Sequence, residues 1–213
     1  YLYPYLFGHA HFNPKDIPFL SFWVINTYFL IKIFKEIDKK KIIKFDIVFY
    51  FALSTSILIS IRIVGILIFL QYLIFLIVYF EISKNKVFDF IKIHKSNIFY
   101  FILLILFFTF LLNPIFWHNP IEILNSIKWM SKYQQNICTL TLGDCMRSLN
   151  LPSSYYFIWL FFKLPILIIF GLLIFPIVEN KLAHNIQNKI YIYSITITAG
   201  SILILFILFN VAV

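Results

Sequence analysis

The stretch FDIVFYFALSTSILISIRIVGILIFLQYLIFLIVYF, residues 45–80, decides the fold of this chain. It is apolar along most of its length and is broken near its middle by Arg62 and Gly65. About 20 apolar residues cross the hydrocarbon core of a bilayer, so the run is too long for one membrane helix. A single kinked helix would hold Arg62 at mid-bilayer, at a cost of about 2.5–3.5 kcal/mol. The sequence therefore predicts two spanning helices, 45–61 and 63–80, that meet in a tight turn at Arg62.

The whole chain has the composition of a membrane protein. Of its 213 residues, 62% are hydrophobic, and the mean hydropathy is +0.90, whereas a soluble domain is roughly half apolar. Further apolar runs predict spans at 17–34, 98–113, 155–175 and 190–210. We therefore expect an all-α fold, a polytopic transmembrane helix bundle with about six spans. It would form a single membrane-embedded domain over residues 1–213. Because the chain begins at Tyr1 and ends in an apolar run, we expect a fragment of a larger protein that lacks its N-terminal part.

The lysines predict how the spans are oriented. The net charge is +9, but the cations are spread over several loops, which argues against a nucleic-acid partner. Short loops rich in lysine face the cytoplasm, so residues 1–16, the turn at Arg62 and the loop 114–154 are predicted to face outward. The cytoplasmic lysines would be Lys35, Lys39, Lys40, Lys41, Lys44, Lys84, Lys86, Lys92, Lys95, Lys181 and Lys189.

The outward loop 114–154 is too long to be a simple connection between spans. Within it, Asn119, Pro120 and Glu122 are typical of a helix start, since an asparagine accepts a bond from a free backbone N–H and proline suits the first turn. Apolar residues at helical spacing then predict a short amphipathic helix at the membrane interface, anchored by Trp117, Trp129 and Tyr133. Two interpretations stay open: a surface helix that caps the bundle, or a helix whose Lys128 and Lys132 gather a lipid phosphate.

The two cysteines, Cys138 and Cys145, lie in the same loop. An oxidising exterior permits a disulfide between them, and the sequence leaves that pairing open. Two isolated cysteines without a nearby histidine at ligand spacing make a poor zinc site.

The block HAHFNPKD, residues 9–16, stands directly before the apolar run that begins at Ile17. Ionisable residues at the end of a span are functional candidates. Asp16 and His11 are suited to bind a divalent cation or to orient an acceptor, and Lys15 and Arg62 to hold a phosphate. Two structural alternatives stay open. Asp16 is favoured by the dipole at a helix start, and it is able to form an ion pair with Arg62 without any catalytic role.

Several of these motifs resemble, in order, segments of the bacterial family 39 glycosyltransferases, relatives of the dolichyl-phosphate-mannose protein mannosyltransferases. The matching segments are HAHFNPKDIPF at 9–19, SIRIVG at 60–65, NPIFWHNPIE at 113–122, KWMSK at 128–132 and LPSSYY at 151–156. The last segment lacks the tryptophan that the family's pattern has after its proline.

The resemblance implies an integral membrane glycosyltransferase of the C-type superfold. Such an enzyme moves a sugar from a polyprenyl-phosphate carrier to a protein or glycolipid acceptor, here at the extracytoplasmic face of a bacterial inner membrane. Carried over by position, Asp16 and His11 would be catalytic, and Asn13, Lys15, Arg62 and Lys128 would bind substrate. The family's catalytic acid pair lies ahead of the first matching segment. A divalent cation is the one cofactor that we consider.

Two other function classes remain. A transporter or lipid flippase would carry repeated halves with broken helices, and the sequence shows no internal repeat. A non-catalytic membrane subunit would need neither repeated halves nor broken helices.

Overall fold

A computed structural model describes residues 14–39, 43–84, 87–119 and 186–208, together with shorter stretches between 121 and 175. The chain divides into two compact units, Tyr1–Met130 and Ser131–Val213. We call them unit 1 and unit 2 and describe each by itself.

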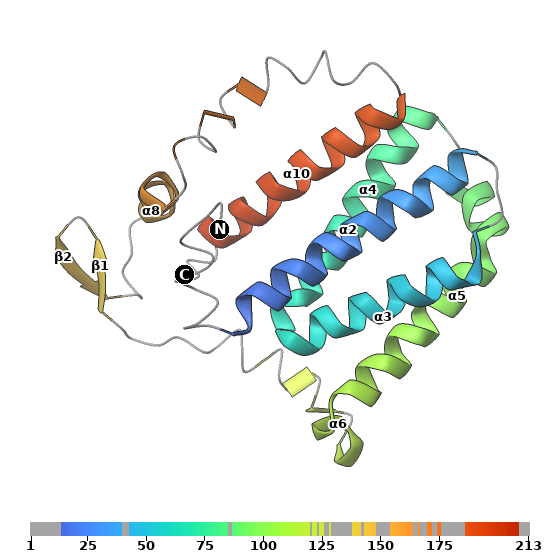
Figure 1. Ribbon diagram of the computed structural model, residues 1–213, viewed down its shortest axis with the longest axis horizontal. Helices are drawn as coiled ribbons and strands as arrows, with labels where there is room; N and C mark the ends of the chain where they lie inside the picture. Colours follow the sequence, from blue (N-terminus) through green and yellow to red (C-terminus); the bar gives the residue numbers. More distant parts are fainter. Residues whose placement is uncertain are drawn as a thin grey trace. The chain divides into compact units, whose positions relative to one another are not determined.

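Unit 1 consists of helices that run alternately up and down (Figure 1). Because successive helices are antiparallel, the ends of neighbouring helices meet at two opposite ends of the unit. In chain order the elements are α2 (Asp16–Asp38), α3 (Phe45–Ile61), the 3-10 helix η1 (Ile63–Leu67), α4 (Ile68–Ser83), α5 (Val87–Leu112) and α6 (Ile115–His118).

The predicted membrane bundle is confirmed in its helices. Within the described residues, four helices are long and apolar enough to cross a membrane: Asp16–Ile37, Ile63–Ser83, Val87–Leu112 and Asn188–Leu205. The helix α3 has 17 residues, or about 26 Å at 1.5 Å per residue, which is the lower limit for a span. Its bounds are those predicted.

The turn at Arg62 is also confirmed. The helix α3 ends at Ile61, Arg62 is extended (φ −146°, ψ 132°), and the Gly65 N–H donates a 2.8 Å hydrogen bond to the Arg62 carbonyl. A Cβ atom added at Gly65 would lie only 2.7 Å from the carbonyl oxygen of Leu58. The turn therefore packs against α3 so closely that a glycine is required.

The predicted start of the fourth span was wrong. The helix α5 begins at Val87 and not near Ile98, so Lys92 and Lys95 lie on a helix and not in a loop. No glycine or proline interrupts residues 87–112, and Asp89 in the first turn is favoured by the helix dipole. Hydropathy marks the part of a helix that lies in the hydrocarbon core, while the helix itself continues until the chain offers a break.

The helices of unit 1 pack through aromatic rings. The helix α3 contacts α2 on one side and α5 on the other. Phe51 on α3 stacks on Phe101 of α5 with 4.7 Å between ring centroids, and its ring also lies 4.9 Å from that of Tyr72 on α4. Phe34 joins α2 to Tyr79 of α4 at 5.1 Å. These contacts hold all four helices in one bundle.

Unit 2 contains a β-hairpin that the sequence analysis did not predict, a local exception to the all-α fold. The strands β1 (Cys138–Thr141) and β2 (Asp144–Arg147) are antiparallel, with Leu140 opposite Cys145. Gly143 adopts a φ of 94° between them, a conformation that favours glycine. Cys145 forms a disulfide, and no cysteine in the described part of the chain is free, which confirms the disulfide that the sequence left open.

Two helices complete the described part of unit 2. They are α8 (Tyr155–Lys163) and α10 (Ile186–Leu208). The predicted span 155–175 begins with α8, and most of its second half lies outside the described residues. The predicted span 190–210 corresponds to α10, which begins slightly earlier.

Candidate functional site

An ion pair joins two of the predicted site residues. Asp16 is the first residue of α2, and Arg62 lies in the turn between α3 and η1. The Arg62 Nη2 atom is 2.5 Å from the Asp16 Oδ1 atom. The structure thus brings together residues that are far apart in the sequence, as the ion-pair alternative predicted.

The Asp16–Arg62 pair is accessible. The Asp16 side chain is 31% exposed and the Arg62 side chain 40% exposed. Ion pairs with this exposure contribute only about 0–1 kcal/mol to stability, so fold stability alone gives little reason for the pair. A guanidinium carries five N–H donors, more than one carboxylate uses. Arg62 is therefore able to bind a second anion while it stays beside Asp16.

The Asp16–Arg62 pair lies at one end of unit 1, which we call the Arg62 end. Further hydrogen bonds stabilise this end. The Asn113 Nδ2 atom, just after α5, donates 2.8 Å bonds to the Ser60 Oγ atom and to the Thr109 carbonyl. The Trp117 Nε1 atom donates a 2.8 Å bond to the Phe110 carbonyl. The end of α5 is therefore held against the last turn of α3, close in sequence to Arg62.

The other predicted site residues are distributed as follows. Lys15 is exposed and directly precedes α2, where its carbonyl accepts a 3.1 Å bond from the Phe19 N–H. Lys128 is exposed at a helical position. His11 and Asn13 lie outside the described residues, so their predicted roles stay predictions.

The predicted helix start in the loop after α6 is confirmed. The Asn119 Oδ1 atom accepts a 3.2 Å bond from the Ile121 N–H, and its Nδ2 atom donates a 3.3 Å bond to Glu122 Oε1. Asn125 reaches the same carboxylate oxygen at 3.2 Å. Residues 122, 124, 125 and 128 are helical, while Trp129, Lys132 and Tyr133 lie outside the described residues.

A buried polar cluster in the middle of the bundle was missed by the sequence analysis. The Asn26 Oδ1 atom on α2 accepts bonds from Ser54 Oγ (3.2 Å), Thr55 Oγ1 (2.8 Å) and Tyr72 Oη (2.9 Å). Asn26 and Thr55 are both 0% exposed. We call these four residues the Asn26 cluster. It links α2, α3 and α4, and the signal for it is a polar residue near the middle of each of three apolar runs.

Gln71 forms a second polar contact beside this cluster. Its Nε2 atom donates a 2.9 Å bond to the Thr27 Oγ1 atom, while its buried Oε1 atom has no hydrogen-bond partner among the described residues. Within the same part of the chain, no three His, Cys, Asp or Glu side chains are placed to hold a metal ion.

No protein-family model, curated protein or solved structure matches this chain. The resemblance to the family 39 glycosyltransferases therefore stays a prediction, and the geometry of the Arg62 end is the basis on which a function is proposed.

Proposed function

We propose that this chain is part of an integral membrane glycosyltransferase that moves a sugar from a polyprenyl-phosphate carrier to a protein or glycolipid acceptor. The observation that carries the proposal is the accessible Asp16–Arg62 pair at the Arg62 end of the helices. An accessible arginine beside a carboxylate, at the end of membrane helices, is suited to an anionic headgroup whose lipid tail stays in the bilayer.

The chemistry that we propose is an inverting displacement at the anomeric carbon of the sugar. Arginine binds phosphate through two parallel N–H···O bonds, so Arg62 would stabilise the departing lipid phosphate. Asp16 orients the guanidinium before the substrate arrives. His11, Asn13, Lys15 and Lys128 would line the same site, and a carboxylate outside this chain would act as general base on the acceptor hydroxyl.

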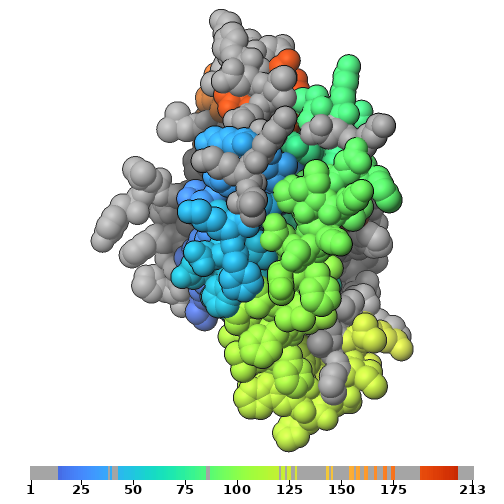
Figure 2. Space-filling model, turned by 90° about the vertical axis from the view of Figure 1, so that its right-hand side faces the viewer, coloured from blue at the N-terminus to red at the C-terminus, as the bar shows by residue number. Residues whose placement is uncertain are grey.

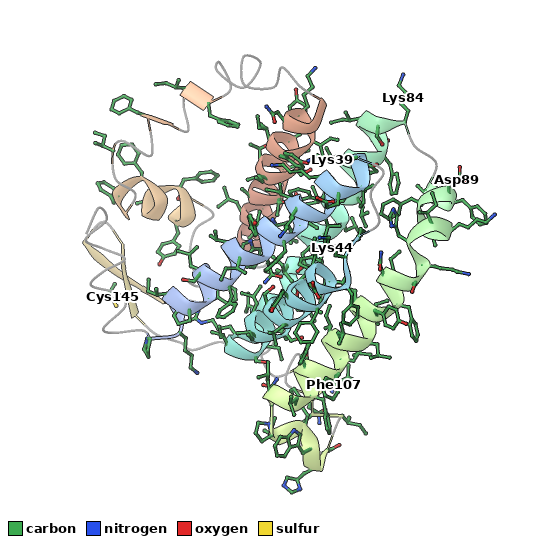
Figure 3. All side chains as sticks on the ribbon, turned by 45° about the vertical axis from the view of Figure 1, so that its right-hand side comes forward. Lys39, Lys44, Lys84, Asp89, Phe107 and Cys145 are labelled. Atoms are coloured by element: carbon green, nitrogen blue, oxygen red, sulfur yellow. The ribbon has the colours of Figure 1, made fainter. Side chains whose placement is uncertain are left out.

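The lysines support a site on the extracytoplasmic face of the membrane. The end of unit 1 opposite Arg62, which we call the lysine end, carries Lys39 and Lys84 at the ends of α2 and α4. Figure 3 shows both residues, with Asp89, far from Phe107 on α5. Positive charge in short connections marks the cytoplasmic side, so the proposed site faces outward.

The test is sugar transfer from radiolabelled polyprenyl-phosphate-mannose in vesicles that contain the intact protein and a membrane extract as acceptor. We expect Arg62→Ala to reduce transfer at least about 100-fold, because loss of one transition-state contact costs about 2.7–4 kcal/mol. Asp16→Asn should also reduce transfer, because Arg62 loses the carboxylate that orients it. Membrane insertion should not change. Asp46→Asn and Lys84→Ala remove the same kinds of charge at the lysine end and should keep full transfer. Transfer at the parent rate in either site variant would contradict the site.

A transporter is the second candidate, and the Asn26 cluster favours it. Polar side chains inside membrane helices often line substrate pathways, and transporter sites lie near the middle of the bilayer. The same vesicles separate the candidates, because a transporter would move substrate across the membrane without consuming the lipid-linked sugar. A non-catalytic subunit would neither move substrate across the membrane nor consume the lipid-linked sugar.

A further inference from the structure

The helix α5 is longer than the membrane requires. Its 26 residues span about 39 Å, while the hydrocarbon core is about 30 Å thick. The apolar part of the helix continues to Leu112, so the surplus of about two turns lies at its N-terminal end. This surplus of about 9 Å, or about six residues, ends at Lys92. Lys95 lies about one turn further in, and its long stem lets the ammonium group reach the depth of the lipid headgroups beside that of Lys92.

One face of α5 combines these lysines with apolar side chains. Residues separated by three and four positions lie on the same side of a helix. Phe88, Lys92, Lys95, Phe99, Ile102 and Leu106 follow this spacing, and all six are exposed. We call them the α5 stripe.

The α5 stripe is not the face that packs on the bundle. Phe101 stacks on Phe51, and Ile105 and Thr109 are the buried residues of the helix. In contrast, Phe99 is 62% exposed and Leu106 66% exposed. Figure 2 shows α5, in green, uncovered along its length on this side of unit 1.

Along the α5 stripe, apolar and charged side chains follow one another in the same order as the acyl chains and headgroup of a phospholipid. Phe99, Ile102 and Leu106 offer an apolar track in the hydrocarbon core, and the two ammonium groups follow at headgroup depth, where long lysine stems reach polar surroundings. Phe88, 77% exposed, lies beyond the lysines, where an aromatic ring suits the membrane interface. Two cations on one face favour an anionic headgroup over a zwitterionic one.

We propose that the α5 stripe is a binding site for one anionic phospholipid, whose acyl chains lie along Phe99, Ile102 and Leu106 and whose phosphate contacts Lys92 and Lys95. This proposal does not depend on the transferase activity, because the stripe lies at the lysine end and on a different helix from Asp16.

The test places a fluorescent reporter on the track. In the Phe99→Trp variant, reconstituted in phosphatidylcholine vesicles, added quenching by brominated phosphatidylglycerol is compared with quenching by brominated phosphatidylcholine, after subtraction of the parent protein's signal. We expect phosphatidylglycerol to associate at least about fivefold more strongly, since each lysine near a membrane surface contributes about fivefold. Adding Lys92→Gln and Lys95→Gln should remove the preference.

The matched control removes two lysines at the same membrane depth on another helix, through Lys35→Gln and Lys39→Gln on α2. The lipid preference of the introduced tryptophan should survive this change. Equal quenching by the two lipids would overturn the proposal. It would also be overturned if Lys35→Gln with Lys39→Gln removed the preference as completely as Lys92→Gln with Lys95→Gln. Protection of the introduced tryptophan from both lipids, with energy transfer between labelled copies, would show that a second copy covers the stripe and would also overturn it. Circular dichroism of each variant verifies that the helices are intact.

Discussion

At the scale of single residues, Gly65 lets the turn after Arg62 pack tightly against α3. Its missing side chain lets η1 approach the backbone of Leu58, where a Cβ would stand 2.7 Å from the carbonyl oxygen. We expect Gly65→Ala to lower the free energy of unfolding by about 1–3 kcal/mol, the range for overpacking, and to reduce sugar transfer as Arg62 shifts. Unfolding in mixed detergent micelles measures the stability. Gly200→Ala is the control, because no atom lies within 4 Å of a Cβ there; equal stability of both variants would contradict the close approach.

Two residues at the Arg62 end could be predicted from the sequence, and Asn26 could not. Asp16 directly precedes an apolar run and Arg62 interrupts one. The topology places both at one end of the bundle, so their proximity follows from charge and from the number of spans between them. Asn26 lies in an apolar run beside Thr27, and its three partners come from two other runs. Its importance depends on which helix faces which, and the composition of one span does not contain that information.

At the scale of helices, the Asn26 cluster joins α2 to α3 and α4 by hydrogen bonds that have no competition from water. Interhelical hydrogen bonds in membranes contribute about 0.6 kcal/mol on average, so we expect Asn26→Leu, which removes three, to cost about 2 kcal/mol. Steric trapping in bicelles measures the loss. Ser21→Ala is the matched control, because the Ser21 hydroxyl bonds only within its own helix in the described contacts, to the Ile17 carbonyl. A stability of Asn26→Leu equal to that of the control would show that the cluster does not hold the helices together.

The helices themselves were predicted with uneven success, for identifiable reasons. The helix α3 ends where a charge and a glycine coincide, so both hydropathy and turn chemistry mark the boundary. The start of α5 was missed because Lys92 and Lys95 lower the local hydropathy without breaking the helix. The hairpin was missed because Leu142 and Gly143 are not the Asn-Gly or Asp-Gly pair that marks a two-residue turn, and because only the first of its two runs alternates.

At the scale of the whole molecule, the orientation of the bundle decides the transferase proposal and sets the leaflet of the lipid site. The Asp16–Arg62 pair and the lysines of the α5 stripe lie at opposite ends of unit 1, so an orientation that puts the lysines on the cytoplasmic side would put the pair outside. A bundle inserted the other way would place Arg62 on the cytoplasmic side, where the proposed polyprenyl-phosphate carrier does not present its sugar. Orientation is therefore the property whose measurement bears on both sites at once.

The orientation is measurable with single introduced cysteines, because Cys145, one of the two native cysteines, is held in a disulfide and the described residues include no free cysteine. Ile121, near the Arg62 end, is 62% exposed, and Lys39 is exposed at the lysine end. A membrane-impermeant maleimide added to intact cells should label Ile121→Cys, and should label Lys39→Cys only after the membrane is permeabilised. The parent protein should stay unlabelled, which also tests the disulfide of Cys145. The reverse pattern would contradict the orientation and with it the extracytoplasmic transferase site. The lipid site on α5 would then be tested in the opposite leaflet, since its two lysines would still lie at headgroup depth.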